Sequence, residues 1–186
     1  MLGTKTILRR LVLPQEKLKF SDYRWEADDR LHVGGINFNL PFTDFTQKTT
    51  EHEVVLLKPK HRLEKYRELF EGQAIANILD FGTWEGGSPI FFAAATSARK
   101  IVGIDIREPA DPILAQAKKF GDRISLVYQT SQSDREKVNA VIDKSFDGPI
   151  DLVVDDASHQ YELTKAAFEI AFARLRIGGL YVIEDW

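Results

Sequence analysis

Acidic side chains and one histidine gather at two places near the end of the chain. Residues 155–159 read Asp-Asp-Ala-Ser-His, and Glu184 and Asp185 follow the last apolar run. Converging carboxylates repel one another unless a cation neutralises them or some stay protonated. A hard divalent ion with oxygen ligands, Mg²⁺ by preference, resolves that conflict. The pattern favours a magnesium site beside an imidazole; the alternative is that either aspartate of the first group simply caps the helix that follows.

A glycine-rich loop, residues 82–88 with the sequence GTWEGGS, joins an apolar run to a helical pattern. Glycines let the backbone turn sharply and approach a ligand closely, and the N-terminus of the following helix offers free N–H groups. The spacing differs from the G-x-G-x-x-G of dinucleotide folds, and the absence of a Gly-Lys-Ser/Thr sequence excludes a P-loop. A ligand-free strand-to-helix turn is the alternative interpretation.

Asp105 ends the next apolar run. An acid at this place can accept hydrogen bonds from both hydroxyls of a ribose, although Asp105 could also serve as an N-cap or turn residue. Together with the G-x-x-x-G spacing and the lack of a phosphate-binding lysine, it favours S-adenosylmethionine over a dinucleotide. Residues 130–132, after the third apolar run, could form hydrogen bonds with the edge of an adenine ring. The candidate cofactor-binding residues are Asp80, Gly82, Thr83, Glu85, Gly86, Ser88, Asp105, Ser131 and Gln132.

Short apolar runs alternate with helical patterns from residue 59 onward. Strands are predicted at 74–81, 100–105, 124–128, 150–154 and 180–183. Helices are predicted at 61–71, 88–98, 112–120, 134–143 and 160–176, the last ended by Gly178-Gly179. Such alternation predicts an α/β fold, a doubly wound and mostly parallel sheet covered on both faces. Ligands of these sheets bind beyond the carboxyl ends of the strands, where all the candidate residues lie.

Residues 1–58 have a less regular sequence pattern, with clustered aromatic residues and polar turns. Short alternating patterns at 31–33 and 36–40 predict two small strands around the turn at Gly34-Gly35. We interpret residues 1–58 as an arm or cap and residues 59–186 as the cofactor-binding core. The arm either packs on the core or covers a substrate.

Composition narrows the class of protein. The chain has 186 residues, of which 44% are hydrophobic and 28% charged, which excludes a disordered tail and a membrane bundle. Its net charge of −3 shows no basic excess, so neither a nucleic acid nor a membrane surface is expected as a partner. The sequence has no cysteine, which excludes disulfides, thiolate metal sites and cysteine nucleophiles. With no signal-peptide pattern and no apolar run near roughly 18 residues, a cytoplasmic location is expected.

Four segments carry a resemblance to a known family: ILDFGTWEGGSPIFFA, IVGID, VVDDASH and GGLYVIED. Together they resemble the Rossmann-like class I S-adenosylmethionine-dependent methyltransferases, over about residues 60–186. More narrowly, they look like the metal-dependent sugar O-methyltransferases of macrolide pathways and the cephalosporin-hydroxylase-like proteins. The resemblance implies methyl transfer to a hydroxyl of a small molecule, a sugar or another natural product. It also implies that Asp156, Glu184 and Asp185 hold Mg²⁺ and that His159 is the general base, while Asp155 either lies behind the metal or simply ends the strand.

One departure from that family lies at the end of the sequence. Class I methyltransferases continue after the fifth strand with a helix and an antiparallel strand pair, whereas this sequence stops at Trp186. We expect the C-terminal strands to be missing, because the chain is a fragment or because a partner chain covers the last strand. An uncovered apolar edge favours self-association as a homo-oligomer.

Three other functions compete with methyl transfer. A nicotinamide-dependent oxidoreductase could use the same kind of sheet, but the glycine spacing speaks against it. A metal-dependent hydrolase would leave the glycine loop and Asp105 without a role. A non-catalytic methyltransferase-like binding module would keep the fold and bind cofactor without transferring its methyl group.

Overall fold

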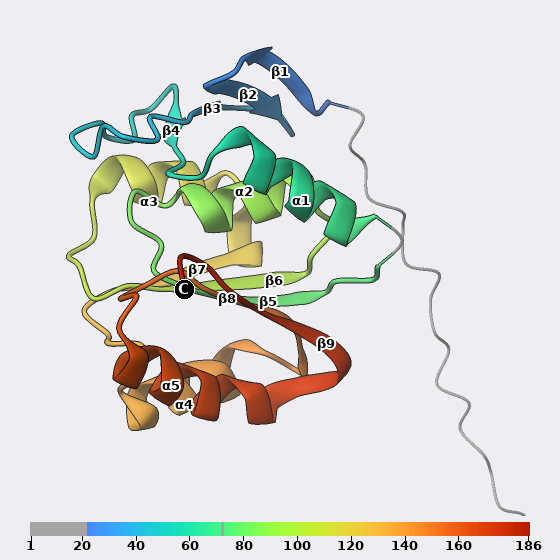
Figure 1. Cartoon of the computed structure of the whole chain (residues 1–186), viewed down its shortest axis with the longest axis vertical. Coiled ribbons are helices and arrows are strands. Elements are labelled where there is room, and N and C mark those ends of the chain that lie inside the picture. The colour runs from blue at the N-terminus through green and yellow to red at the C-terminus, as the bar shows by residue number, and fades with distance from the viewer. Residues whose placement is uncertain (1–21, 72) are drawn as a thin grey trace, which may run out of the picture.

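The computed structural model describes residues 22–71 and 73–186, and its centre is a five-stranded parallel sheet (Figure 1). The strands are β5 (Asn77–Phe81), β6 (Lys100–Ile104), β7 (Ile124–Val127), β8 (Ile150–Asp155) and β9 (Leu175–Ile183). Their order is β7-β6-β5-β8-β9, and every neighbouring pair is parallel. The first strand of the core lies in the middle, and the chain winds to one edge and then to the other. The doubly wound α/β fold predicted from the sequence is therefore confirmed.

Helices cover both faces of this sheet. They are α1 (Lys60–Phe70), α2 (Gly87–Ala95), α3 (Asp111–Lys118), α4 (Arg135–Ser145) and α5 (Tyr161–Ala171), with short 3-10 turns at Gly121–Arg123 and Phe172–Arg174. Helices α1, α2 and α3 lie on one face, and α4 and α5 on the other (Figure 1). Every residue of β5 and β8 is consequently buried, which is why these strands are mostly apolar in sequence. Among the described residues, no helix is long and apolar enough to cross a lipid bilayer.

A second, smaller sheet precedes the core. It contains β1 (Arg24–Ala27), β2 (Arg30–Val33), β3 (Ile36–Asn39) and β4 (Val54–Val55), in that order. It lies over α1 and α2, on the side away from the large sheet (Figure 1). Phe38 of β3 is completely buried and meets the ring of Phe91 of α2 edge-on, with centroids 6.0 Å apart. The small sheet and the first helical layer therefore share one hydrophobic core.

The two strands predicted around Gly34-Gly35 are confirmed as β2 and β3. Strands β1 and β4 were not predicted, because β1 is largely exposed and β4 has only two residues. Residues 1–21 of the predicted arm lie outside the described residues.

The prediction that a helix extends to residue 176 is wrong. Helix α5 ends at Ala171, and strand β9 already begins at Leu175. Its register against β8 shifts between the pairs Ile150↔Leu175 and Leu152↔Leu180, so the two glycines lie in a bulge of the strand and do not end a helix. Gly178, with φ of +76°, supplies the backbone conformation that this irregularity needs. Strand β9 forms an edge of the large sheet.

Candidate functional site

The glycine loop and the acidic segment meet at the carboxyl ends of the central strands. Asp156 donates its N–H to the carbonyl of Phe81, the last residue of β5 (2.9 Å). Gly82 follows with φ of +85°, and a Cβ added there would lie 2.3 Å from the carbonyl oxygen of Asp156. Only glycine permits this backbone conformation together with this close approach. The two predicted functional segments therefore line the same crevice.

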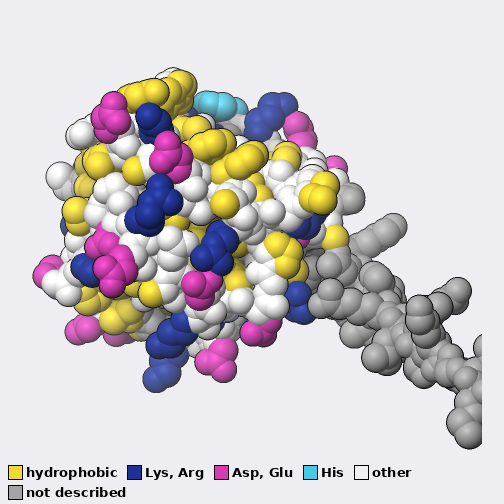
Figure 2. Space-filling view, turned by 90° about the horizontal axis from the view of Figure 1, so that it is seen from below, with side chains coloured by type: hydrophobic (Ala, Val, Ile, Leu, Met, Phe, Trp, Pro, Cys, Tyr) yellow, Lys and Arg dark blue, Asp and Glu magenta, His cyan; other side chains and the backbone are white. Residues whose placement is uncertain are grey.

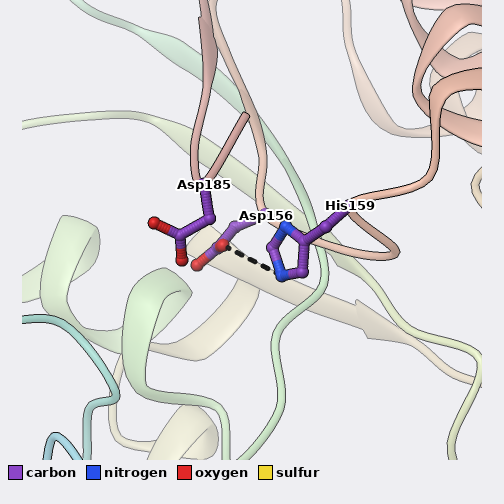
Figure 3. A group of neighbouring side chains, drawn as sticks. All are labelled: Asp156, His159 and Asp185. Carbon is purple, nitrogen blue, oxygen red and sulfur yellow. Dashed lines mark ion pairs between the residues drawn. The ribbon is translucent and has the colours of Figure 1, made fainter.

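Asp156, His159 and Asp185 come together at this edge of the sheet (Figure 3). Each offers one ligand atom, and these atoms lie within 4.8 Å of one another. The Nε2 atom of His159 is 3.9 Å from Oδ1 of Asp156. His159 and Asp185 are exposed and Asp156 is half-buried, so a solute can reach all three. Two carboxylates and an imidazole form a donor set that suits a divalent ion, and we call these three residues the acid–histidine group.

The backbone is strained at this group. Among the described residues, the non-glycine residues with positive φ are Trp84, Gln129, His159 and Asp185. His159 and Asp185 belong to the acid–histidine group, and Trp84 lies in the glycine loop. Such conformations cost about 1–3 kcal/mol each and gather at functional sites, where the surrounding structure holds them.

Glu184, the third predicted metal ligand, faces helix α1 instead. Its side chain is 3% exposed. Oε1 accepts hydrogen bonds from Lys58 Nζ (2.6 Å) and from the hydroxyl of Tyr66 (2.5 Å), and Oε2 accepts one from Arg62 Nη1 (2.7 Å). Arg62 and Tyr66 are one helical turn apart and therefore lie on the same face of α1. The described structure does not place Glu184 in the acid–histidine group, and its role as a ligand stays a prediction.

Lys58 is a functional candidate that the sequence analysis missed. Only 2% of its side chain is exposed, and its ammonium group lies between Oε1 of Glu184 (2.6 Å) and Oδ2 of Asp156 (2.7 Å). Burial lowers the pKa of Lys58, but the attraction of the two carboxylates outweighs it and raises the pKa above its usual range. Burial raises the pKa of Asp156. Burial also acts to raise the pKa of Glu184, but Lys58, Tyr66 and Arg62 together outweigh it and the pKa is lowered. A lone lysine at the end of the apolar run 54–57 was the feature that could have identified it.

The carboxylate of Asp105 holds the glycine loop through its backbone N–H groups. Its side chain is buried, and Oδ2 accepts the backbone N–H groups of Thr83 and Trp84, both at 2.9 Å. Oδ1 accepts the N–H of Arg107 (2.8 Å). The carboxylate thus holds the loop in shape, while the predicted contact with a ribose stays a prediction.

Asp80 and Ser88 form a buried pair where the glycine loop leaves β5 and enters α2. Asp80 is completely buried, and its Oδ2 accepts a hydrogen bond from the Ser88 hydroxyl (2.5 Å). Its Oδ1 is buried without a hydrogen-bond partner, and burial raises the pKa of Asp80 to about 8. Gly86 is the N-cap of α2, in the left-handed conformation. The loop is therefore anchored at both of its ends.

Glu85 connects the loop to the arm that precedes the core. It is 4% exposed, and its carboxylate accepts hydrogen bonds from Lys48 Nζ (2.9 Å), the N–H of Thr49 (3.3 Å) and Arg107 Nη2 (3.0 Å). Its backbone carbonyl accepts another from the Thr49 hydroxyl (2.7 Å). With its carboxylate occupied in this way, Glu85 braces the loop, and its predicted contact with a cofactor stays a prediction.

The segment after β7 adjoins both loops. Thr130 donates its N–H to the carbonyl of Asp105 (3.0 Å). Gln132 is buried and donates from Nε2 to Oδ1 of Asp155 (3.3 Å), whereas Ser131 is half-buried and bonds to the Ser133 hydroxyl (2.9 Å). The structure therefore brings Ser131 and Gln132 to the same edge of the sheet as the glycine loop.

A doubly wound sheet with a glycine loop after its first strand and an acid after its second defines a class of proteins that bind nucleoside cofactors. Residues 79–186 match the family model of a methyltransferase domain, and the chain belongs to this family. The resemblance to methyltransferases is thereby confirmed.

Relatives with known activities agree in class. The mycinamicin VI 2''-O-methyltransferase of Micromonospora griseorubida is 32% identical over 103 residues, which are 55% of this chain and 23% of that protein. The ribosomal RNA large subunit methyltransferase E of Desulfosudis oleivorans is 31% identical over 133 residues, which are 64% of this chain and 57% of that protein. This chain thus spans less than a quarter of the macrolide relative.

A solved structure gives the same result. The MycE methyltransferase of the mycinamycin biosynthetic pathway, in complex with Mg, SAH and mycinamycin VI, superposes with a TM-score of 0.52 at 28% identity. The match covers 69% of this chain and 34% of that one.

Proposed function

We propose that this chain is the cofactor-binding core of an S-adenosylmethionine-dependent O-methyltransferase that uses Mg²⁺ and acts on a hydroxyl of a small molecule. The observation that carries the proposal is the contact between Gly82 and the backbone of Asp156. It brings the cofactor loop and the acid–histidine group into one crevice. The macrolide methyltransferase among the relatives supports a sugar or another natural product as the acceptor.

The residues around the glycine loop suit a nucleoside cofactor with a charged amino-acid end. A small hollow there is lined by Lys58, Gly82, Thr83, Ser88 and Asp156, among others. Next to it, the unpaired Oδ1 of Asp80 is a buried polar atom that a polar group of the cofactor or a water would satisfy. Asp105, Ser131 and Gln132 would then serve the nucleoside end, as the sequence predicts.

The acid–histidine group suits a divalent ion. Asp156 and Asp185 are the carboxylates that would hold Mg²⁺, with Glu184 behind them. When bound, the cofactor supplies an electrophilic methyl group and the ion lowers the pKa of a coordinated hydroxyl. His159 would remove the hydroxyl proton at Nε2, the atom that lies 3.9 Å from Oδ1 of Asp156.

A small molecule fits the charge of this protein better than a nucleic acid. The net charge is −3, and acidic and basic side chains are interspersed on the face seen in Figure 2. Nucleic-acid sites instead gather Lys and Arg on one face. We also propose a cytoplasmic location, as expected from the sequence.

Two measurements test the proposal. Isothermal titration with S-adenosylmethionine and with its demethylated product, with and without Mg²⁺, is expected to show micromolar binding. Transfer of a labelled methyl group is then followed with free sugars, a catechol and ribosomal RNA as acceptors. Transfer to the RNA alone would contradict the small-molecule acceptor, and cofactor binding with no transfer would indicate the non-catalytic module.

Variants assign the roles. His159→Ala is expected to lower turnover by about 10²-fold or more and to leave the cofactor Kd nearly unchanged. His52→Ala, at an exposed position, is the matched control. Asp156→Ala is expected to abolish stimulation by Mg²⁺. Equal loss of turnover and cofactor affinity in His159→Ala would contradict its assignment as the base.

A further inference from the structure

Five charged side chains form a continuous chain of ion pairs behind the acid–histidine group. Asp156 pairs with Lys58 (2.7 Å), Lys58 with Glu184 (2.6 Å), Glu184 with Arg62 (2.7 Å), and Arg62 with Asp185 (2.5 Å). The signs alternate along this ion-pair chain. Its two ends, Asp156 and Asp185, are the two carboxylates of the acid–histidine group.

Asp156 and Asp185, the two ends of the ion-pair chain, each contact a cation of the chain and also face the exposed site. Asp156 turns Oδ2 toward the buried Lys58 and Oδ1 toward the exposed His159. Asp185 is 53% exposed, yet one of its oxygens is held by Arg62. The carboxylates that would bind an ion are thus oriented by cations of the protein itself, one of them inside the core.

The buried centre of the ion-pair chain has a cost and a consequence. Lys58 and Glu184 are 2% and 3% exposed, so each needs the other to offset its lost hydration. The fixed positive charge of Lys58 also repels any cation that approaches Asp156. Since a divalent ion carries two charges, this repulsion acts twice as strongly on the ion as on a monovalent cation.

We propose that Lys58 is a positioning residue that acts as a built-in counter-cation: it holds Asp156 and Glu184 in place before a divalent ion arrives and limits how tightly that ion binds. The inference rests on the proposed metal site. It assigns a role to a residue outside the segment that matches the methyltransferase family, residues 79–186. It also explains why Glu184, although placed beside Asp185 in the sequence, is turned toward α1.

The test is Lys58→Met, with Lys60→Met as the matched control. Lys60 is two residues away, but its side chain is 41% exposed and pairs with Asp28 on the surface. Titration with Mn²⁺ and Mg²⁺ by calorimetry gives the Kd of the ion, and thermal unfolding gives Tm with and without the ion. Neither readout requires turnover.

Lys58→Met is expected to lower the metal-free Tm and to tighten ion binding by at least tenfold, so that the ion raises its Tm more than it raises that of the wild type. Lys60→Met is expected to change neither. A lower Tm with an unchanged Kd would reduce Lys58 to a structural role and overturn the inference. If the wild type binds no ion at all, the metal part of the proposed function fails instead.

A second variant covers the case in which Lys58→Met does not fold. Replacing both of the most deeply buried charges, in Lys58→Met/Glu184→Gln, also removes the buried carboxylate that Lys58→Met leaves unpaired at Glu184, and is expected to recover folding. In the single variant, refolding in Mn²⁺ is expected to have the same effect. If the ion fails to recover the single variant while the double variant folds, the ion does not substitute for Lys58 and the inference is wrong.

Discussion

Asp105 offers a direct test of how the glycine loop keeps its shape. Its two oxygens accept three backbone N–H groups, those of Thr83, Trp84 and Arg107. Asp105→Asn preserves the volume of the side chain but leaves one oxygen. If that oxygen takes the place of Oδ2, the N–H of Arg107 faces an amide NH₂ group and loses its acceptor.

The expected loss of stability follows from these bonds. Losing one hydrogen bond to a charged acceptor costs about 1.5–3 kcal/mol. The two bonds that remain change from charge-assisted to neutral, and neutral bonds are roughly half as strong. We expect the free energy of unfolding to fall by about 3–6 kcal/mol in total.

Urea denaturation measures this loss, with Asp147→Asn, at an exposed position, as the control. The midpoint of Asp105→Asn should fall with an unchanged m-value, and cofactor affinity should fall with it. Surface substitutions usually change the free energy of unfolding by no more than about 0.5 kcal/mol. If the free energies of unfolding of Asp105→Asn and the control differ by no more than this, the carboxylate does not support the loop. Weaker cofactor binding at unchanged stability would instead favour the ribose contact predicted from the sequence.

Three further substitutions test the anchors of the core. Gly82→Ala is expected to cost about 2–4 kcal/mol, because a Cβ would strike the carbonyl of Asp156 at a positive φ, whereas Gly148→Ala, in open space, should be neutral by the same urea assay. The urea midpoint of Asp80→Asn should rise relative to that of the wild type as pH increases from 5 to 8. The pKa of Asp80 is about 8 in the folded protein against its ordinary value of 3.8, so the stability that the protonated carboxyl contributes is complete below pH 3.8 and is lost as pH rises toward 8. An equal difference at both pH values would refute that pKa. Asp134→Ala removes the N-cap bond of α4 and should lower the free energy of unfolding by about 1 kcal/mol; an unchanged urea midpoint would show that the cap is dispensable.

The fold was predictable because its central strands are buried on both faces. β5 and β8 have no exposed residue, so each appears in the sequence as a mostly apolar segment of strand length. The end of α5 was not predictable in this way, because an apolar helical pattern continues into residues that belong to β9. There Arg176 donates from Nε to Oδ1 of Asp151 (2.5 Å), a tertiary contact that holds the start of the edge strand against β8. Local patterns carry no information about such a partner.

The candidate site shows the same limit more sharply. The sequence places carboxylates at the ends of neighbouring strands, and the structure does bring Asp156 and Asp185 together with His159. The sequence cannot show which carboxylates keep an oxygen free, because that depends on cations far away along the chain: Lys58 lies 126 residues from Glu184. Glu184 receives three hydrogen bonds from the α1 side, whereas Asp185 receives one, from Arg62. The availability of each acid for an ion is therefore determined by the segment that enters α1, so the chemistry of this edge depends on residues outside the matched methyltransferase segment as much as on the acids themselves.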